Sequence, residues 1–290
     1  MKFKTVAKLR DFNKDYQPNK LRFPRICTIK YDGRHTTIFK KVNGDVEYYS
    51  SSGKMFKLLD DQVFGFDDTP VGVYFAEMMG EGVEGKLGDR VHSGIQTTMF
   101  TNTKKGILNK HKPTWRIFDF VTFEDYEKGE SALGFVDRFS YLMEHIPTQY
   151  LAYNMESLEL AHDEMFLNKV VEAGYEGIVS IDFDHRWAAT KSRKWTAIKW
   201  KKRPTADLLC TGTTEGEGKY EGQIGALLLV DSMGRSVSVG SGLSDSDRAM
   251  DSEEFVGKVV EIEYEQITNC SYIQPTFVRV REDKRVEEID

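Results

Sequence analysis

The feature that most restricts the fold is a change of composition at Arg203–Pro204. Residues 204–290 hold 18 Asp and Glu against 8 Lys and Arg, a balance of −10, whereas residues 1–203 have a balance of +4. The acidic part contains short strand-like runs separated by glycine-rich turns, including IGALLLVD, RSVSVGSG, KVVEIEYEQIT and TFVRVRE. This pattern predicts a small closed or sandwiched β domain at 204–290 that follows a larger domain at 1–203.

The larger domain is expected to mix strands and helices. Residues 36–50 alternate polar and apolar side chains around Asn43–Gly44, which predicts a β-hairpin with a type I′ turn. Helical spacing of apolar residues predicts amphipathic helices at 130–146 and at 155–174, the second ending at Gly174. Segment 84–113 is rich in polar, basic and turn residues, so we expect a long excursion there.

Composition excludes several classes of protein. The 290 residues are 40% hydrophobic, which suffices for buried cores. No run approaches the roughly 18 apolar residues of a membrane span, and the N-terminal sequence lacks the apolar stretch of a secretory signal, so we expect a cytoplasmic protein without a membrane partner. Three scattered cysteines indicate neither a disulfide framework nor a four-cysteine zinc site.

Charge is concentrated at the junction of the two parts. The net charge of −6 would count against a nucleic-acid partner, because phosphate binding depends on Lys and Arg. Residues 191–203, KSRKWTAIKWKKR, nevertheless have seven basic residues and no acidic one. This run predicts either a solvated basic face or, given Trp195 and Trp200, a lined groove.

Lys30 is the residue that most suggests chemistry. A lysine attacks an electrophile only when neutral, and a phosphate electrophile needs cations or a metal to absorb the developing charge. Glu77 and Glu176 each follow or precede a short apolar run, where an unpaired carboxylate would be costly. Lys199 and Lys201 alternate in IKWK, so both would project from one face of a strand. These are the components of nucleotidyl transfer.

The order of these motifs resembles that of the ATP-dependent DNA ligases, members of the covalent nucleotidyltransferase superfamily. The motifs are KYDG at 30–33, the glutamate of FAEMMG, the aromatic residue of RIFDFV, EGIV at 176–179, IKWK at 198–201 and REDK at 281–284. The length resembles that of the minimal enzymes of bacteriophages and large DNA viruses. The resemblance implies an α+β fold, in which an antiparallel-sheet nucleotidyltransferase (adenylation) domain at 1–203 precedes an OB-fold β-barrel domain at 204–290.

The resemblance also implies a role for each matched residue. Lys30 would be the nucleophile that takes AMP from ATP, with Asp32 and Gly33 completing its motif. Lys199 and Lys201 would grip the α-phosphate, and Glu176 would bind Mg²⁺. The other nucleotide contacts would be Thr28 near adenine, Glu77 on the ribose, Phe118 stacked on adenine, and Arg281 with Asp283 and Lys284 on the pyrophosphate. The implied partner is nicked double-stranded DNA, bound by a monomer. Separately, the basic residues of the 84–113 excursion, which include Lys86, Arg90 and Lys104, lead us to expect that it helps to grip DNA.

Some positions depart from the family pattern. The usual KxDGxR has His35 in place of its arginine, with Arg34 beside it as one possible substitute. Two alternatives stay within the superfamily, an RNA ligase and an mRNA capping guanylyltransferase. A third is a noncatalytic OB-fold protein that binds single strands by stacking. Pro275 and Phe277 ahead of REDK favour the DNA ligase interpretation.

Overall fold

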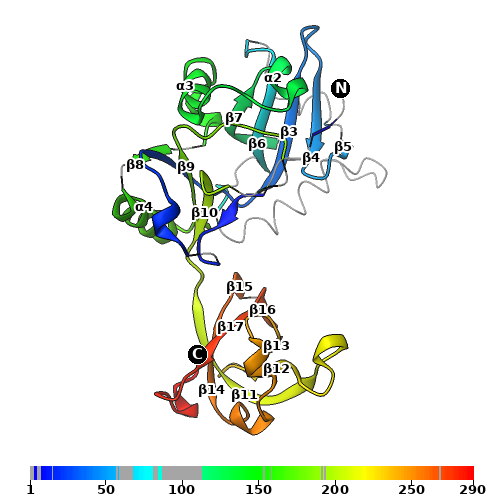
Figure 1. The fold of residues 1–290 in the computed structure, drawn as a ribbon, viewed down its shortest axis with the longest axis vertical. Coiled ribbons are helices and arrows are strands. Elements are labelled where there is room, and N and C mark those ends of the chain that lie inside the picture. The colour runs from blue at the N-terminus through cyan, green and yellow to red at the C-terminus, as the bar shows by residue number, and fades with distance from the viewer. Residues whose placement is uncertain are drawn as a thin grey trace. The chain divides into compact units, whose positions relative to one another are not determined.

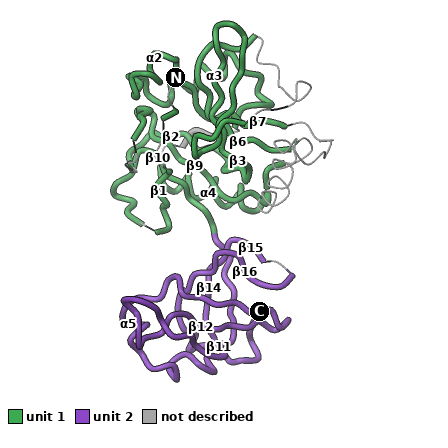
Figure 2. Tube along the Cα trace, turned by 90° about the vertical axis from the view of Figure 1, so that its right-hand side faces the viewer, with its two compact units in different colours: residues 1–202 green, residues 203–290 purple. Residues whose placement is uncertain are grey.

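The chain divides into two compact units, Met1–Lys202 and Arg203–Asp290 (Figures 1 and 2). The computed structural model describes residues 3–4, 8–14, 16–56, 58, 68–80, 84–86, 113–152, 154–157, 159–190, 192, 194–267 and 269–290. Most of the predicted 84–113 excursion lies outside these residues. In the part of the chain that is described, no helix has the length and apolar character needed to span a membrane.

The first sheet of unit 1 has the strand order β1-β10-β9-β2-β8. Its neighbouring strands are antiparallel except for β1 and β10, which are parallel. Its strands are β1 (Arg10–Asp11), β2 (Arg25–Ile29), β8 (Asn154–Ser157), β9 (Gly177–Asp182) and β10 (Ala197–Lys201). The inner strands β2 and β9 read RICTI and GIVSID, and their β-branched residues suit strands that are covered on both faces.

The second sheet of unit 1 is antiparallel throughout, in the order β5-β4-β3-β6-β7. Its strands are β3 (Arg34–Lys40), β4 (Val46–Ser50), β5 (Met55–Phe56), β6 (Gly72–Gly80) and β7 (Pro113–Val121). The predicted hairpin is confirmed as β3–β4, but the predicted type I′ turn is wrong. That turn needs positive φ at both central residues, and of Asn43 and Gly44 only the glycine has it, at +87°. The Lys41 N–H donates to the Asp45 carbonyl at 2.9 Å. The hairpin loop therefore consists of the three residues 42–44, one more than the two-residue loop of a type I′ hairpin.

Among its described residues, unit 1 has the α-helices α2 (Phe123–Lys128), α3 (Phe135–His145) and α4 (Leu160–Glu172). The helix predicted at 130–146 is confirmed as α3, which begins five residues later than predicted, after Gly134, and ends one residue earlier. The helix predicted at 155–174 ends as expected, since Gly174 has φ +90° and its N–H donates to the Val171 carbonyl at 2.9 Å. Its predicted start is wrong, because residues 154–157 instead form β8 along the edge of β2.

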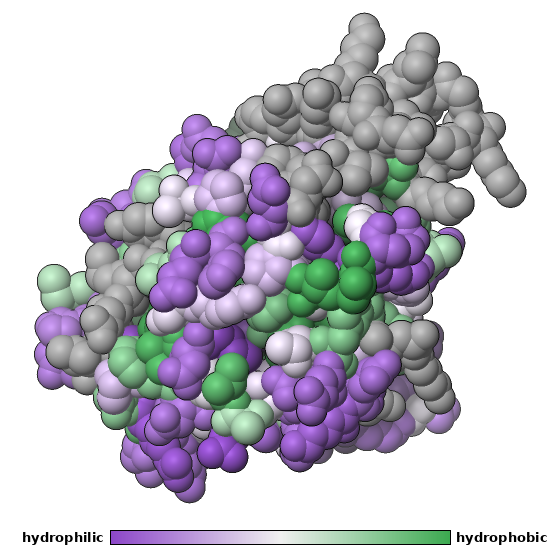
Figure 3. Space-filling view, turned by 90° about the horizontal axis from the view of Figure 1, so that it is seen from above, coloured by the Kyte–Doolittle hydropathy of each residue, from purple (hydrophilic) through white to green (hydrophobic). Residues whose placement is uncertain are grey.

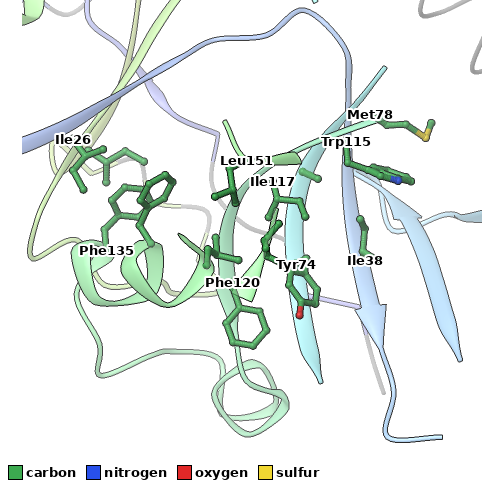
Figure 4. Close-up of a cluster of buried hydrophobic side chains, with 14 of the residues drawn as sticks. Ile26, Ile38, Tyr74, Met78, Trp115, Ile117, Phe120, Phe135 and Leu151 are labelled. Carbon is green, nitrogen blue, oxygen red and sulfur yellow. The ribbon is translucent and has the colours of Figure 1, made fainter. Parts of the chain in front are cut away.

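The main core of unit 1 lies between its two sheets and against α3. Figure 4 shows Ile26 of β2 and Phe135 of α3 on one side, and Tyr74, Ile117 and Phe120 of the second sheet on the other. On the opposite face of the first sheet, α4 packs onto β2 and β9. Its buried side chains there are Phe166, Leu167 and Val170, against Cys27 and Ile178. Seen from above in Figure 3, the described surface is mostly hydrophilic, with hydrophobic residues in small groups.

Unit 2 is a five-stranded antiparallel sheet in the order β13-β12-β11-β14-β17, with a separate ribbon β15-β16. The elements are β11 (Thr205–Glu215), β12 (Ile224–Val230), β13 (Ser236–Val239), α5 (Asp245–Arg248), β14 (Val259–Glu263), β15 (Gln266–Ile267), β16 (Tyr272–Ile273) and β17 (Thr276–Val280). The Phe277 N–H donates to the Ser241 carbonyl at 2.8 Å. This bond joins the chain after β13 to β17, so the two edges of the sheet meet. Each of the four predicted strand runs contains a strand, and the pattern missed β11 and the two-residue strand β16.

Candidate active site

Strand pairing brings Lys30 and Glu176 side by side. Lys30 follows β2, Glu176 precedes β9, and the Lys30 N–H donates to the Gly177 carbonyl at 2.9 Å. The side-chain ammonium of Lys30 forms an ion pair with Glu176 Oε2. The Lys30 side chain is 24% exposed and that of Glu176 is 8% exposed. Lys30 is therefore exposed enough to meet a ligand, and its ion pair with Glu176 holds the ammonium in place.

Lys201 completes the cluster from the neighbouring strand. It is the last residue of β10 and lies opposite Gly177 in the β9–β10 ladder. Its ammonium pairs with Oε1, so each carboxylate oxygen of Glu176 contacts one lysine. Burial would raise the pKa of Glu176, but the charges of Lys30 and Lys201 outweigh it and hold that pKa below its ordinary value. The structure thus places two cations around one ionised carboxylate.

Lys199 lies two residues before Lys201 on the same face of β10, as the alternation predicted. Its Nζ is 3.2 Å from Oδ2 of Asp11 on β1. Burial lowers the pKa of Lys199, Asp11 opposes this shift, and the nearby charges of Lys201 and Lys30 add to it. Lys199 and Lys201 project from one face of β10, and Lys201 shares Glu176 with Lys30, so the three lysines border the same part of the sheet.

Two glycines permit the close approach of strands at this space. A Cβ on Gly33 would lie 2.7 Å from the Met78 carbonyl oxygen of β6. A Cβ on Gly177, whose φ is +150°, would lie 2.3 Å from the Trp200 carbonyl oxygen of β10. Any side chain at either position would push apart the strands that carry the charged residues.

Glu77 and Asp32 place further carboxylates near the lysines. Glu77 is on β6 opposite His35 of β3, and the Gly33 backbone hydrogen-bonds its carboxylate. Burial raises the pKa of Glu77 to about 7, Lys30 opposes the shift, and the charges of Glu176 and Asp32 reinforce it. Asp32 is buried, and its N–H donates to the Gly85 carbonyl at 3.0 Å. The structure therefore brings Glu77 and Asp32 to the Lys30–Glu176 pair.

The aromatic residue proposed for the nucleotide lies on the same face as Glu77. Phe118 of β7 is partly exposed, and its ring centroid is 5.7 Å from that of His35. Phe120 is instead buried in the core against Tyr74 and Tyr141, which leaves Phe118 as the more accessible ring.

The residues on either side of the lysine motif differ in burial and in the face of the strand on which they lie. Thr28 is buried in β2, two residues before Lys30. Burial lowers the pKa of His35 to about 4, so its ring is neutral at physiological pH. Arg34 lies over the Phe56 ring at 4.7 Å, on the other face of β3 from His35. Arg34 therefore does not share the face of β3 on which position 35 lies.

The tail motif belongs to unit 2. Arg281 Nη1 is 3.1 Å from Asp207 Oδ2, and Lys284 Nζ is 2.6 Å from the same oxygen. Arg281 also pairs with Asp283 at 2.7 Å. The hydrogen bond with Asp283 and the charge of Asp207 raise the pKa of Arg281. Asp207 on β11 thus forms ion pairs with both Arg281 and Lys284 within unit 2.

Sequence reasoning did not single out Asp11, the partner of Lys199. Asp11 lies in AKLRDFNKDY, where it reads as an ordinary surface acid. Its role depends on the pairing of β1 with β10, which lies almost 190 positions further along the chain. No local signal marks such a contact.

Comparisons with known proteins agree with this geometry. Residues 215–281 match the family described as DNA ligase OB-like domain. The chain is 36% identical over 121 residues to DNA ligase 1 of Methanosarcina acetivorans, which covers 36% of this chain and 20% of that protein. The chain is also 28% identical over 176 residues to the DNA ligase of Methanoculleus marisnigri, and this match covers 50% of this chain and 30% of that protein. The matched parts span less than a third of these curated relatives.

Solved structures of DNA ligases share the fold. A structure from a study of DNA binding with a minimal scaffold in Lig E DNA ligases has a TM-score of 0.70 at 17% identity, covering 97% of this chain and 100% of that one. The ATP-dependent DNA ligase from bacteriophage T7 in complex with ATP has a TM-score of 0.52 at 18% identity, and the match covers 96% of this chain and 98% of that one. The predicted fold class, a nucleotidyltransferase domain followed by an OB-fold domain, is confirmed, as is the resemblance to DNA ligases.

Proposed function

We propose that this chain is an ATP-dependent DNA ligase that seals nicks in duplex DNA through an AMP group carried by Lys30. The observation that carries the proposal is the cluster of Lys30, Glu176 and Lys201 at the meeting of three strands. The fold and the DNA ligase relatives support DNA as the partner, and the ATP complex of the phage enzyme supports ATP as the nucleotide. No observation favours RNA or GTP.

In the first step the Lys30 amine attacks the α-phosphorus of ATP. A nitrogen–phosphorus bond forms, the bond to pyrophosphate breaks, and the attacking amine loses a proton. Lys199 and Lys201 lie on the same face as Lys30 and supply positive charge where negative charge develops on the α-phosphate. The AMP then passes to the 5′-phosphate at the nick, and the adjacent 3′-hydroxyl displaces it to close the strand. The protein contributes position and charge compensation to each transfer.

The remaining assignments concern the nucleotide. Glu77 would accept hydrogen bonds from the ribose hydroxyls, Phe118 would stack on adenine, and Thr28 would lie beside the base. Arg281 and Lys284, which share Asp207, would orient the pyrophosphate. We expect the enzyme to act as a monomer.

Glu176 is the residue that would hold Mg²⁺. Within the described residues no group of three or more His, Cys, Asp or Glu side chains could bind a metal ion together. A single carboxylate can hold Mg²⁺, because this ion commonly takes one or two protein carboxylates and completes its shell with water and substrate phosphates. At Glu176 the ion would have to replace a contact with Lys30 or Lys201. When bound, the ion would neutralise charge on the transferring phosphate.

The test is incubation with labelled ATP and Mg²⁺, followed by intact mass measurement and peptide mapping. The parent chain is expected to gain one AMP on Lys30, and Lys30→Ala is expected to gain none. Lys41→Ala is the matched control, because Lys41 is a solvent-exposed lysine of the β3–β4 hairpin that pairs with Glu47. An adduct on another residue, or none in the parent chain, would contradict the proposal. Parallel reactions with GTP, and with nicked DNA and nicked RNA, separate the superfamily alternatives.

A further inference from the structure

The N-terminal strand contributes a carboxylate to the catalytic face of β10. β1 and β10 are parallel, and Asp11 is the direct partner of Lys199 in their ladder. The Asp11 side chain is 12% exposed, and its Oδ2 lies 3.2 Å from Lys199 Nζ. We propose that Asp11 is a positioning residue, which holds the Lys199 ammonium in place for the α-phosphate of ATP. The inference rests on the proposed function and extends it to a residue outside the matched motifs.

The backbone fixes the position of Asp11 independently of its charge. The N–H of the next residue, Phe12, donates to the Lys199 carbonyl at 3.0 Å. The Phe12 side chain is fully buried, and its ring packs edge-on against Trp200 with centroids 4.7 Å apart. Because Arg10 pairs with Ile198 and Phe12 is held by Lys199 and Trp200, the register of β1 on β10 is fixed and Asp11 stays beside Lys199.

A separate carboxylate for Lys199 is needed because Glu176 is already shared. Its two oxygens contact Lys30 and Lys201, one each. The charged groups that act on Lys199 are Asp11 from β1, Lys201 from β10 and Lys30 after β2. Both lysines repel the Lys199 ammonium, and without Asp11 it would turn toward solvent or compete for Glu176. Asp11 therefore gives the third ammonium of this face a carboxylate of its own, while Lys30 and Lys201 share Glu176.

The experiment measures the single-turnover rate of AMP transfer to the full chain at saturating ATP and Mg²⁺. The variants are Asp11→Asn, Lys199→Met and the double substitution, with Glu47→Gln as a control at an ion pair of the second sheet. If Asp11 acts through Lys199, Asp11→Asn is expected to slow transfer about 10- to 100-fold, as misplaced or unsupported catalytic groups do. The double variant is then expected to be no slower than Lys199→Met, because Asp11 has nothing left to position.

Other outcomes are distinguishable. Equal rates for Asp11→Asn and the parent, or losses that multiply in the double variant, would overturn the inference while leaving the proposed function intact. Absence of the adduct in the parent chain would overturn the proposed function itself.

Asp11→Glu keeps the charge and is expected to recover most of the rate. A merely structural role predicts no such recovery and no shift of the pH profile. Loss of Asp11 should move the alkaline limb to lower pH, because the remaining neighbours favour a neutral Lys199.

Discussion

Glu77 illustrates how one site residue opposes stability. Burial raises its pKa from 4.5 to about 7, so the folded chain binds this proton more tightly than the unfolded chain does. Its contribution to stability is therefore greatest below pH 4.5 and declines as the pH rises toward 7. Glu77→Gln, which carries no charge, is expected to be more stable than the parent at pH 8, by at most about 3 kcal/mol at 1.36 kcal/mol per pKa unit. Urea unfolding at pH 5 and pH 8 measures the difference.

The control for this prediction is Glu47→Gln on the β3–β4 hairpin. A hydrogen bond from Lys41 lowers the pKa of Glu47, so ionised Glu47 stabilises the folded chain. Glu47→Gln should therefore lower the stability at pH 8, where Glu77→Gln should raise it. The effect should stay below about 1 kcal/mol, as for exposed ion pairs generally. An equal gain for Glu77→Gln at both pH values would contradict the assignment of its stability effect to ionisation.

At the scale of elements, α3 is tied to the second sheet by a buried ion pair. Arg138 of α3 contacts both oxygens of Asp119 on β7, with Nε at 2.8 Å and Nη2 at 2.9 Å. Asp119→Ala leaves the guanidinium buried without its carboxylate, which is expected to cost about 3–5 kcal/mol in urea unfolding. Glu254→Ala removes the exposed pair with Lys258 and should cost less than about 0.5 kcal/mol. Similar losses for the two variants would refute this role of the pair.

Which elements could be predicted depended on where their partners lie. The β3–β4 hairpin, α3 and β12 have periodic patterns of their own, and the sequence predicted each of them. β8 was assigned to a helix because its MES run continues the helical spacing of α4, whereas the open edge of β2 recruits it as a strand. The two residues of β1 carry no pattern at all. The same distinction applies to the site: the motifs predicted that Lys30, Glu176 and Lys201 belong together, and Asp11 escaped because only a distant strand pairing reveals it.

At the scale of the whole molecule, each unit has a hydrophobic core of its own. Unit 2 has its own core, which includes Leu208, Leu227 and Ile262. Its chain ends are joined inside the unit, since the Asp290 N–H donates to the Asp207 carbonyl at 3.0 Å. A fragment of residues 203–290 therefore satisfies its central strand β11 with β12 on one side and β14 on the other.

We expect this fragment to unfold in urea as one cooperative transition, followed by near-ultraviolet circular dichroism of its tyrosines. In the full chain, Asp119→Ala should lower the midpoint of unit 1 and leave the transition of unit 2 where the isolated fragment has it, because the ion pair of Asp119 and the core of unit 2 share no residues. Tyr272 is a suitable reporter for unit 2, since it is buried and its hydroxyl donates to Asp231 at 2.9 Å. A fragment without a cooperative transition, or an Asp119→Ala chain in which both midpoints fall together, would show that the two units depend on each other for folding.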